Sequence, residues 1–293
     1  MGSSRSTACG AGAPDVRPAR AVQVGLTALI LLYLLFPVIV VLAISFSSAT
    51  YLRFPPPGLS LRWYAKLAAS DEWLQAFALT LQVGAVTTLF STLLGVPAAF
   101  GLVRLELRAK ALLNGLLLMA LITPAVIRAL GSYLFFAPLG LVNSVVGLAC
   151  AHTVSALPYL VINVVASLKG FDLAIERAAV VHGASPLTAI RRITLPIIAP
   201  GILVGAIFAF LSSAQELLVS IYLMGTVRKP LAVKMWEGVR VAVDPTIAAA
   251  STGVIVMAVL AFATASVLHR RVRRATAWDA SLPEAAERSP GRV

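Results

Sequence analysis

Six long apolar runs constrain the fold of this chain more than any other feature of its sequence. A helix needs roughly 20 mostly apolar residues to cross a bilayer, and each run is at least that long. The runs occupy residues 22–46, 77–103, 112–135, 143–168, 198–224 and 246–268. An unpaired backbone N–H or C=O is too costly in hydrocarbon, so such a run crosses as a helix. We therefore predict an all-α, polytopic membrane protein with about six transmembrane helices.

Composition excludes a water-soluble domain. Hydrophobic residues make up 59% of the 293 residues, and charged residues make up only 12%. A soluble domain carries about twice that share of charge, so lipid must be the solvent for much of this surface. The two cysteines, Cys9 and Cys150, form neither a disulfide framework nor a metal-binding spacing.

Lys and Arg residues are divided unequally between the two sides of the predicted bundle. With both termini placed on one side, 16 lie there and 7 lie on the other, while Arg128 lies within a run. This asymmetry predicts that both termini are cytoplasmic. The chain then divides into a disordered tail at 1–20, a transmembrane domain at 21–268 and a basic cytoplasmic tail at 269–293. This topology and contact with anionic lipid headgroups account for the net charge of +12, so we do not expect nucleic acid as a partner.

The cytoplasmic loop 170–196 has the sequence signals of two short helices. Asp172 can cap a first helix at 173–182, and Gly183 can end it in the left-handed conformation. Ala178–Ala179 leave one side of this helix flat, so that another surface can approach closely. Spacing alone does not distinguish a docking element from an ordinary pair of interfacial helices.

The second half of this loop contains a further cap and a turn signal. Ser185 followed by Pro186 is typical of a helix start, and this second helix is expected to continue to about Ile193. Leu195-Pro196 is then expected to turn the chain into the fifth run. Two short helices at an angle would form a stiff projection suited to transmitting force.

The spacing within this loop resembles the EAA loop of the membrane subunits of ATP-binding-cassette (ABC) importers. The core of that loop is two alanines, a glycine and then Ile-x-Leu-Pro, found here as Ala178, Ala179, Gly183, Ile193, Leu195 and Pro196. The usual Glu before the alanines is replaced by Arg177, and the acidic residue is Glu176, one position earlier. The resemblance implies the fold of a type I ABC importer permease, whose coupling helices in this loop dock into a cytoplasmic ATPase dimer.

The resemblance extends from about Leu61 to Leu268. Over this range the chain is most similar to polyamine permeases of the spermidine/putrescine type. It is carried by residues 62–64, Gly95 with Pro97 and Ala98, 169–172, 234–240 and 244–249. It implies a second permease subunit of like fold, a separate substrate-binding protein and a location in the bacterial inner membrane. The implied substrate is a polyamine or a related small organic solute.

One segment between the last two runs also has a purely physical interpretation. Residues 230–242 have the pattern of an amphipathic helix on the outer membrane face, with Trp236 at the headgroup level. The resemblance implies that this segment faces the substrate-binding protein. For Trp236 alone we favour a plain interfacial anchor.

Polar residues within the runs are the candidates for a translocation path. They are Arg128, Ser212, Ser213, Gln215 and Glu216. The two charged residues are expected at similar depth, and each costs a few kcal/mol unless it is paired or wetted. They either neutralise each other, or Glu216 faces the path and attracts a cation. Because polyamine permeases tend to carry two adjacent acidic residues here, whereas this chain has Gln215-Glu216, we favour the pair.

Three further features of the runs concern packing. Gly201 and Gly205 form a small-residue pair that would let another helix approach closely. We expect His152 and Asn163 to be packing residues with satisfied hydrogen bonds.

The sequence contains no motif for catalysis or nucleotide binding. It has no His-Glu-x-x-His, no nucleophile motif and no Gly-Lys pair, so it cannot form a P-loop. We expect a transport subunit without catalytic residues, metal or cofactor, and ATP hydrolysis in a separate polypeptide. The alternative is a secondary transporter or channel that works alone. Such carriers usually show internal repeats and several ionisable residues at the midplane, and no repeat is visible here.

Overall fold

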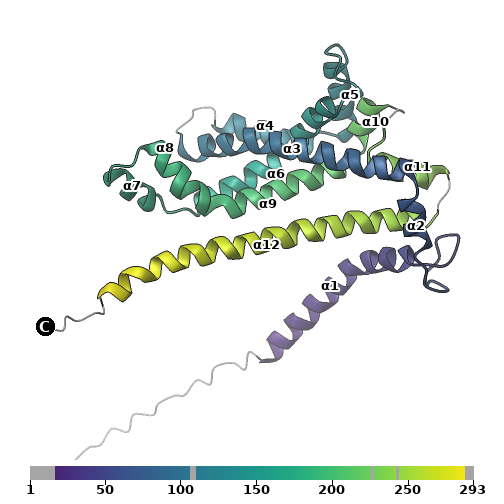
Figure 1. The fold of residues 1–293 in the computed structure, drawn as a ribbon, viewed down its shortest axis with the longest axis horizontal. Helices are drawn as coiled ribbons and strands as arrows, with labels where there is room; N and C mark the ends of the chain where they lie inside the picture. The colour runs from purple at the N-terminus through teal and green to yellow at the C-terminus, as the bar shows by residue number, and fades with distance from the viewer. Residues whose placement is uncertain (1–16, 106–109, 226–227, 242–243, 288–293) are drawn as a thin grey trace, which may run out of the picture.

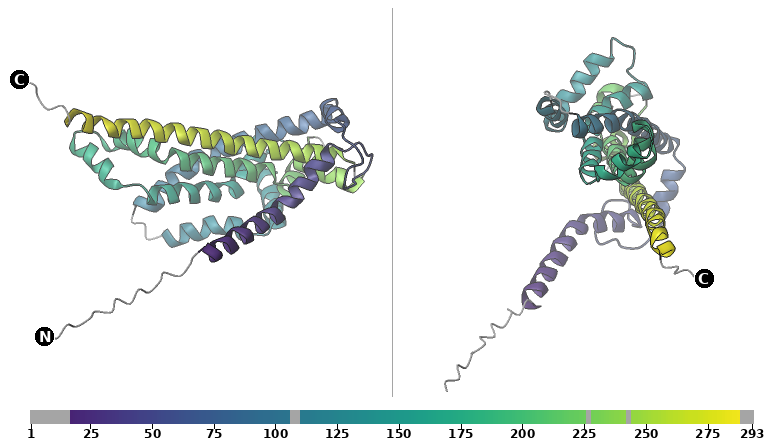
Figure 2. Two further views of the ribbon diagram at one scale, coloured as in Figure 1. Left: turned by 90° about the horizontal axis from the view of Figure 1, so that it is seen from below. Right: turned by 90° about the vertical axis from the view of Figure 1, so that its left-hand side faces the viewer.

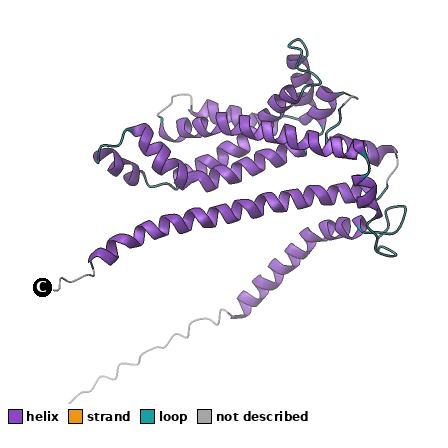
Figure 3. Ribbon diagram, in the orientation of Figure 1, coloured by secondary structure: helices purple, strands orange, loops and turns teal. Residues whose placement is uncertain are grey.

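The structure, a computed structural model, describes residues 17–105, 110–225, 228–241 and 244–287. Within these ranges the chain is almost entirely helical, and Figure 3 shows no strand. In chain order the helices are α1 (Arg17–Ser45), α2 (Arg62–Ala68), α3 (Asp71–Arg104), α4 (Lys110–Ile122), α5 (Ala125–Phe136), α6 (Val145–Lys169), α7 (Leu173–Val181), α8 (Pro186–Ala189), the π-helix η1 (Ile190–Thr194), α9 (Leu195–Ala214), α10 (Leu218–Met224), α11 (Leu231–Val241) and α12 (Thr246–Glu287).

Five helices are long and apolar enough to cross a membrane, and the count is six if α4 and α5 together form one span. The prediction of an all-α protein with about six spans is therefore confirmed. The apolar side chains of α1 lie mostly on the surface, with Val22 69% and Tyr33 78% exposed. Such an exposed apolar helix suits lipid as its solvent.

The core of the bundle is formed by α3, α6 and α9, which pack against one another. Small residues let these helices approach closely. A methyl group added at Gly205 of α9 would lie only 3.0 Å from the Leu160 Cα of α6, and one added at Gly95 of α3 would collide with the Leu160 side chain. At Gly201 an added methyl group would collide with Ser167 of α6. The predicted close approach at Gly201 and Gly205 is thus confirmed, and α6 is the partner helix.

Two of the predicted runs are not single straight helices. The run at 112–135 is bent by 105° between α4 and α5, where Pro124 lacks the N–H for a regular helical bond. The run at 198–224 is interrupted at residues 215–217, between α9 and α10. At this interruption Ser220 Oγ donates a hydrogen bond of 2.6 Å to the Glu216 carbonyl oxygen, which replaces a lost backbone partner.

The expected turn at Leu195-Pro196 is wrong, because the chain remains helical from α8 through η1 into α9. Pro196 has no N–H, so the regular pattern of four-residue bonds cannot pass through this segment unchanged. In η1 the Leu195 N–H instead donates to the Ile190 carbonyl oxygen, five residues back. A π-helical turn therefore accommodates the proline without ending the helix.

The outer helices also extend beyond the predicted boundaries. Residues 17–20, expected in the N-terminal tail, form the first turn of α1, and α12 continues past residue 268 to Glu287. Cys9, the rest of the N-terminal tail and residues 288–293 lie outside the described residues.

The helices place two groups of short elements at opposite ends of the bundle (Figures 1 and 2). α7 and α8 lie at the end toward which the start of α1 and the end of α12 point. α2, α11 and the first turn of α3 lie at the other end. If the former end is the cytoplasmic one, as the Lys and Arg distribution predicts, the latter faces outward.

Candidate functional site

Of the two short helices predicted in loop 170–196, the first is present as α7, whereas the second is not separate: α8 is the first turn of the helix that continues through η1 into α9. The Asp172 carboxylate accepts a hydrogen bond of 2.9 Å from Ala174 N–H, and Ser185 Oγ accepts one of 3.3 Å from Thr188 N–H. Gly183 lies between the helices with φ of +92°, a conformation that side chains disfavour. The two caps and the glycine thus define how α7 and α8 meet, as the sequence predicted.

The α7–α8 pair exposes apolar and basic side chains together. Val181 is 84% exposed and Leu187 is 58% exposed. Arg177 and Ala178 are exposed as well, whereas Ala179 is half-buried. α7 is too short to span a membrane, and α8 is the outermost turn of the long helix that continues through η1 into α9. This surface is therefore suited to contact with another protein.

Glu176 faces inward, where three elements meet. Arg104 at the end of α3 donates two hydrogen bonds to its carboxylate, of 2.7 and 2.6 Å. Thr194 Oγ1, at the end of η1, donates a third to the same carboxylate. The Arg104 and Glu176 side chains are only 20% and 14% exposed. We call Arg104, Glu176 and Thr194 the Glu176 clamp, which fastens α7 to both α3 and the start of α9.

The clamp perturbs the ionisation of Glu176 and explains its unusual position. Hydrogen bonds from Arg104, and then from Thr194, hold the pKa of Glu176 below its ordinary value, so the carboxylate is ionised at neutral pH. A shift of one position turns a helical side chain by about 100°. Glu176 therefore points into the clamp. Arg177 occupies the exposed position at which the EAA loop of ABC importers usually has its glutamate.

The remaining residues of the predicted coupling motif lie on the core side of the loop or at its edge. Ile193 and Leu195 are partly buried against the core cluster of α3, α6 and α9, and Pro196 is exposed. Sequence analysis did not single out Arg104 or Thr194. Arg104 is 72 residues from Glu176 in the sequence. No local pattern indicates which basic residue will form an ion pair with a carboxylate one position before its usual place in the motif.

The structure brings Arg128 and Glu216 together in the interior of the bundle. Arg128 Nη2 of α5 lies 3.5 Å from Glu216 Oε2, and the two side chains are 19% and 10% exposed. Ser155 of α6 accepts a hydrogen bond from Arg128 Nη1 and donates one of 3.4 Å to Glu216 Oε2. The two opposite charges therefore neutralise each other in a region where an unpaired charge would be costly.

His152 continues this polar cluster toward α3. Its ring is 2% exposed; Nδ1 lies 2.9 Å from Ser213 Oγ, and Nε2 lies 3.2 Å from Ser220 Oγ. Ser213 Oγ also donates to Thr87 Oγ1 at 3.3 Å. Both ring nitrogens thus have partners, as expected of a packing histidine. The cluster links five helices: α3, α5, α6, α9 and α10.

Two of the proposed path residues are not part of this cluster. Ser212 is half-buried and makes no side-chain hydrogen bond within the described part of the chain. Gln215 is exposed and borders an apolar groove of about 570 Å³, which is also lined by Pro37 of α1 and Trp236 of α11. Of the five candidates, the structure therefore joins Arg128, Ser213 and Glu216.

The fold and these sites define a class of protein: a polytopic, helical membrane protein with an exposed helical projection at one end of its bundle and a polar interior. Comparison with known families identifies the class more closely. Residues 91–275 match the family described as binding-protein-dependent transport system inner membrane component. This match covers more than half of the chain, and the protein belongs to that family.

Curated relatives align along most of the chain. This chain is 28% identical over 260 residues to the spermidine/putrescine transport system permease protein PotC of Escherichia coli K12. The alignment covers 89% of this chain and 98% of that protein. The chain is 29% identical over 227 residues to the putrescine transport system permease protein PotI of the same strain, covering 75% and 80%. The trehalose transport system permease protein SugB of Mycobacterium tuberculosis is 26% identical, covering 84% and 92%.

Solved structures support the fold. A chain of a bacterial ABC transporter involved in the import of the acidic polysaccharide alginate superposes with a TM-score of 0.63 at 16% identity, covering 88% of this chain and 98% of that chain. The prediction of an ABC importer permease fold is therefore confirmed.

Proposed function

We propose that this chain is the permease subunit of an ATP-driven, binding-protein-dependent importer in a bacterial cytoplasmic membrane. Loop 170–196 docks on a separate cytoplasmic ATPase dimer, and both chain termini lie on that same side. The observation that carries the coupling role is the α7–α8 pair, which exposes Val181 and Leu187 while the Glu176 clamp fastens it to the bundle.

The same helices connect the docking element with the polar interior. The clamp joins α7 to α3 and to η1, which continues into α9. Farther along, α3 carries Thr87 and α9 carries Ser213, which are hydrogen-bonded to each other. A displacement of α7–α8 by the ATPase would therefore act on α3 and α9, two of the five helices that meet at the Arg128–Glu216 cluster. Because packed helices move as stiff bodies, this arrangement provides a direct mechanical route.

The proposed substrate is a polyamine such as spermidine or putrescine, or a related small organic solute. This choice is supported by the names of relatives that align over most of the chain. The interior cluster has no net charge, because Arg128 offsets Glu216. In this proposal the substrate-binding protein selects the solute, and the permease supplies half of the path.

The single docking element implies a paired assembly. An ATPase dimer presents two equivalent faces, whereas this chain has one loop of this kind. We propose that a second permease subunit of like fold supplies the other loop and the other half of the path. A solved structure of similar fold is that of a bacterial alginate ABC transporter in complex with an alginate pentasaccharide-bound periplasmic protein, and it supports an external binding protein as a further partner.

Cysteine cross-linking tests the docking role directly. Val181→Cys would be introduced into a chain whose own cysteines are replaced by serine, and cross-linked to single cysteines in the co-expressed ATPase subunit. We expect adducts that depend on nucleotide state. Leu59→Cys is the matched control, because Leu59 is 82% exposed but lies in the segment between α1 and α2, at the opposite end. Cross-linking from Leu59 and none from Val181 would refute the proposal.

A further inference from the structure

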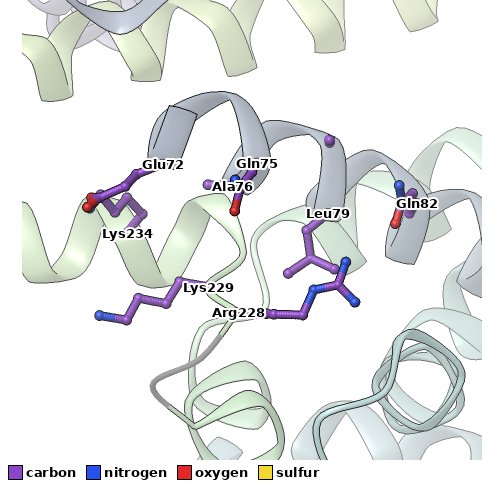
Figure 4. A pocket seen from close by; sticks show the side chains of 9 residues that line it. Glu72, Gln75, Ala76, Leu79, Gln82, Arg228, Lys229 and Lys234 are labelled. Carbon is purple, nitrogen blue, oxygen red and sulfur yellow. The ribbon is translucent and has the colours of Figure 1, made fainter. Parts of the chain in front are cut away.

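A polar pocket of about 440 Å³ lies at the end of the bundle opposite α7 and α8. One wall is a stripe of α3, and the other is formed by the segment before α11 and by α11 itself. Its lining residues, most of them labelled in Figure 4, are Glu72, Gln75, Ala76, Ala78, Leu79, Gln82, Arg228, Lys229 and Lys234. We call this the outer pocket.

Both walls of the outer pocket are anchored in the fold. The Leu231 N–H donates a buried hydrogen bond of 2.8 Å to Thr80 Oγ1, which fixes the start of α11 on α3. Leu231 is 1% exposed and packs with Trp73 and Ala76 of α3. These contacts fix the α11 side of the pocket against α3, and Arg228 lies three residues before Leu231 with its side chain exposed at the mouth of the pocket.

The charges of the pocket are only partly compensated. Lys234 pairs with Glu72, and Lys229 Nζ lies 2.9 Å from Glu237 Oε2. Arg228 has no carboxylate within ion-pair distance in the described part of the chain. Figure 4 shows its guanidinium extending away from the Glu72–Lys234 pair, toward the other end of the pocket. An unpaired guanidinium in a hollow, with Gln82 on the opposite wall, provides donors for an anion.

We propose that the outer pocket receives an acidic side chain of the substrate-binding protein and that Arg228 is the residue that binds it. The guanidinium presents a planar fork of N–H donors that matches the two oxygens of a carboxylate. The amide groups of Gln75 and Gln82 and the ammonium of Lys229 can donate further hydrogen bonds. This inference rests on the proposed function, which places a binding protein at this end.

The charge of the whole outer end supports an acidic protein as the occupant. The helices and loops of this end carry seven basic residues, Arg53, Arg62, Lys66, Arg228, Lys229, Lys234 and Arg240, against the four acidic residues Asp71, Glu72, Glu237 and Asp244. A positive surface attracts an acidic partner and speeds its association. The same field repels a free polyamine, so this pocket is unsuited to bind the proposed cationic substrate itself.

The test measures docking of the binding protein on the whole transporter. The complex with its ATPase and second permease is placed in nanodiscs of phosphatidylcholine, which has no net charge. The probe is the host's own spermidine-binding protein loaded with spermidine, and the readout is the concentration that half-maximally stimulates ATP hydrolysis. Variants are Arg228→Gln, Arg228→Glu and Arg228→Lys. Arg53→Gln is the control, because Arg53 is an exposed base of the same end outside the pocket.

We expect Arg228→Gln to raise the half-maximal concentration about tenfold, because one charge-assisted contact is lost. Arg228→Glu should raise it further, whereas Arg228→Lys should raise it less than Arg228→Gln and Arg53→Gln should leave it unchanged. The maximal rate should be the same in every variant, which also shows that each complex is folded. Added salt should weaken docking of the wild type more than docking of Arg228→Gln.

Two results would overturn this inference alone. One is an unchanged half-maximal concentration in Arg228→Glu. The other is an effect of Arg228→Gln that appears only after anionic phosphatidylglycerol is added, which would identify the pocket as a lipid site. If the spermidine-loaded binding protein does not stimulate even the wild-type complex, the proposed import of a polyamine fails, and this inference fails with it.

Discussion

Replacing Glu176 by Gln should loosen the coupling loop while leaving the membrane bundle intact. Gln has the shape of Glu but no charge, so it loses the paired charge-assisted bonds from Arg104 and retains an oxygen that can accept from Thr194. The contacts that fasten α7 to the end of α3 would then be weakened. We expect uptake to fall while the chain still inserts at normal abundance and ATP hydrolysis continues.

The geometry of the clamp sets the size of this effect. A hydrogen bond to a charged group contributes about 1.5–3 kcal/mol when it is shielded from water, and less when it is solvated. Arg104 makes two such bonds, at 2.7 and 2.6 Å, and its side chain is still 20% exposed. We therefore expect a coupling energy of about 2 kcal/mol between the two residues, which corresponds to about a 30-fold change in the equilibrium between fastened and loosened states of the loop.

A double-mutant cycle measures this energy. Hydrogen exchange of the α7 amides is compared in the wild type, Glu176→Gln, Arg104→Gln and the double variant, with uptake measured in parallel. Each single variant should reduce protection, and the double variant should be scarcely worse than either. Asp71→Asn is the control, because it removes an exposed carboxylate from the other end of α3. Additive losses, or normal uptake by Glu176→Gln at normal abundance, would show that the Arg104–Glu176 contact does not fasten the coupling loop.

The clamp also predicts a pH dependence. Because the fastened state lowers the pKa of Glu176, its stabilisation is fully present above the ordinary carboxyl pKa of 4.5 and is lost as pH falls through the lower folded value. α7 protection should therefore be unaffected by Glu176 titration between pH 6 and 8 and should fall only below about pH 4.5. A titration of protection near neutral pH that disappears in Glu176→Gln would contradict the assignment.

Three further predictions concern the loop and the bundle. Gly183→Val should uncouple ATP hydrolysis from uptake without reducing abundance. Because an added methyl group would meet no atom within 4 Å, the cost of about 1–2 kcal/mol comes only from the left-handed backbone conformation. Normal uptake would contradict this prediction. Glu216→Gln should lower abundance on immunoblots, and Arg128→Gln in the same chain should partly restore it. The reason is that one unpaired buried charge costs more than the absence of both charges. Lost uptake at normal abundance, without rescue by the second change, would instead assign Glu216 to the substrate path. Gly95→Val should reduce abundance and thermal stability by forcing α3 away from Leu160. Gly115→Val should have a far smaller effect, because no neighbour lies within 4 Å of an added methyl group there. Equal losses of abundance and stability in the two variants would contradict the predicted close packing at Gly95.

The helical architecture could be predicted from the sequence because hydrocarbon leaves few alternatives for an apolar run of this length. Local signals also predicted the caps at Asp172 and Ser185 and the left-handed Gly183, since each depends on residues adjacent in sequence. Hydropathy could not predict where a run bends or breaks. Pro124 accompanies a sharp bend, whereas Pro196 is absorbed by a π-helical turn, and the difference depends on packing around each residue.

The candidate site was predicted less completely, because its key contacts join distant segments. The Arg128–Glu216 pair could be anticipated, since two charges at similar depth in lipid have few other partners. The Glu176 clamp could not, because several bases on the same side were equally available. His152, Ser155 and Thr87 acquire their shared role only when α3, α5, α6 and α9 pack together.

Transport by the purified complex in proteoliposomes shows whether this chain is the permease of an ATP-driven importer. The permease pair and its ATPase are reconstituted with the binding protein on one side and ATP on the other, and accumulation of radiolabelled spermidine is followed. We predict accumulation that requires ATP, the ATPase and the binding protein together, and that is abolished when hydrolysis is blocked. Accumulation by this chain alone, driven by an ion gradient and indifferent to ATP, would contradict it.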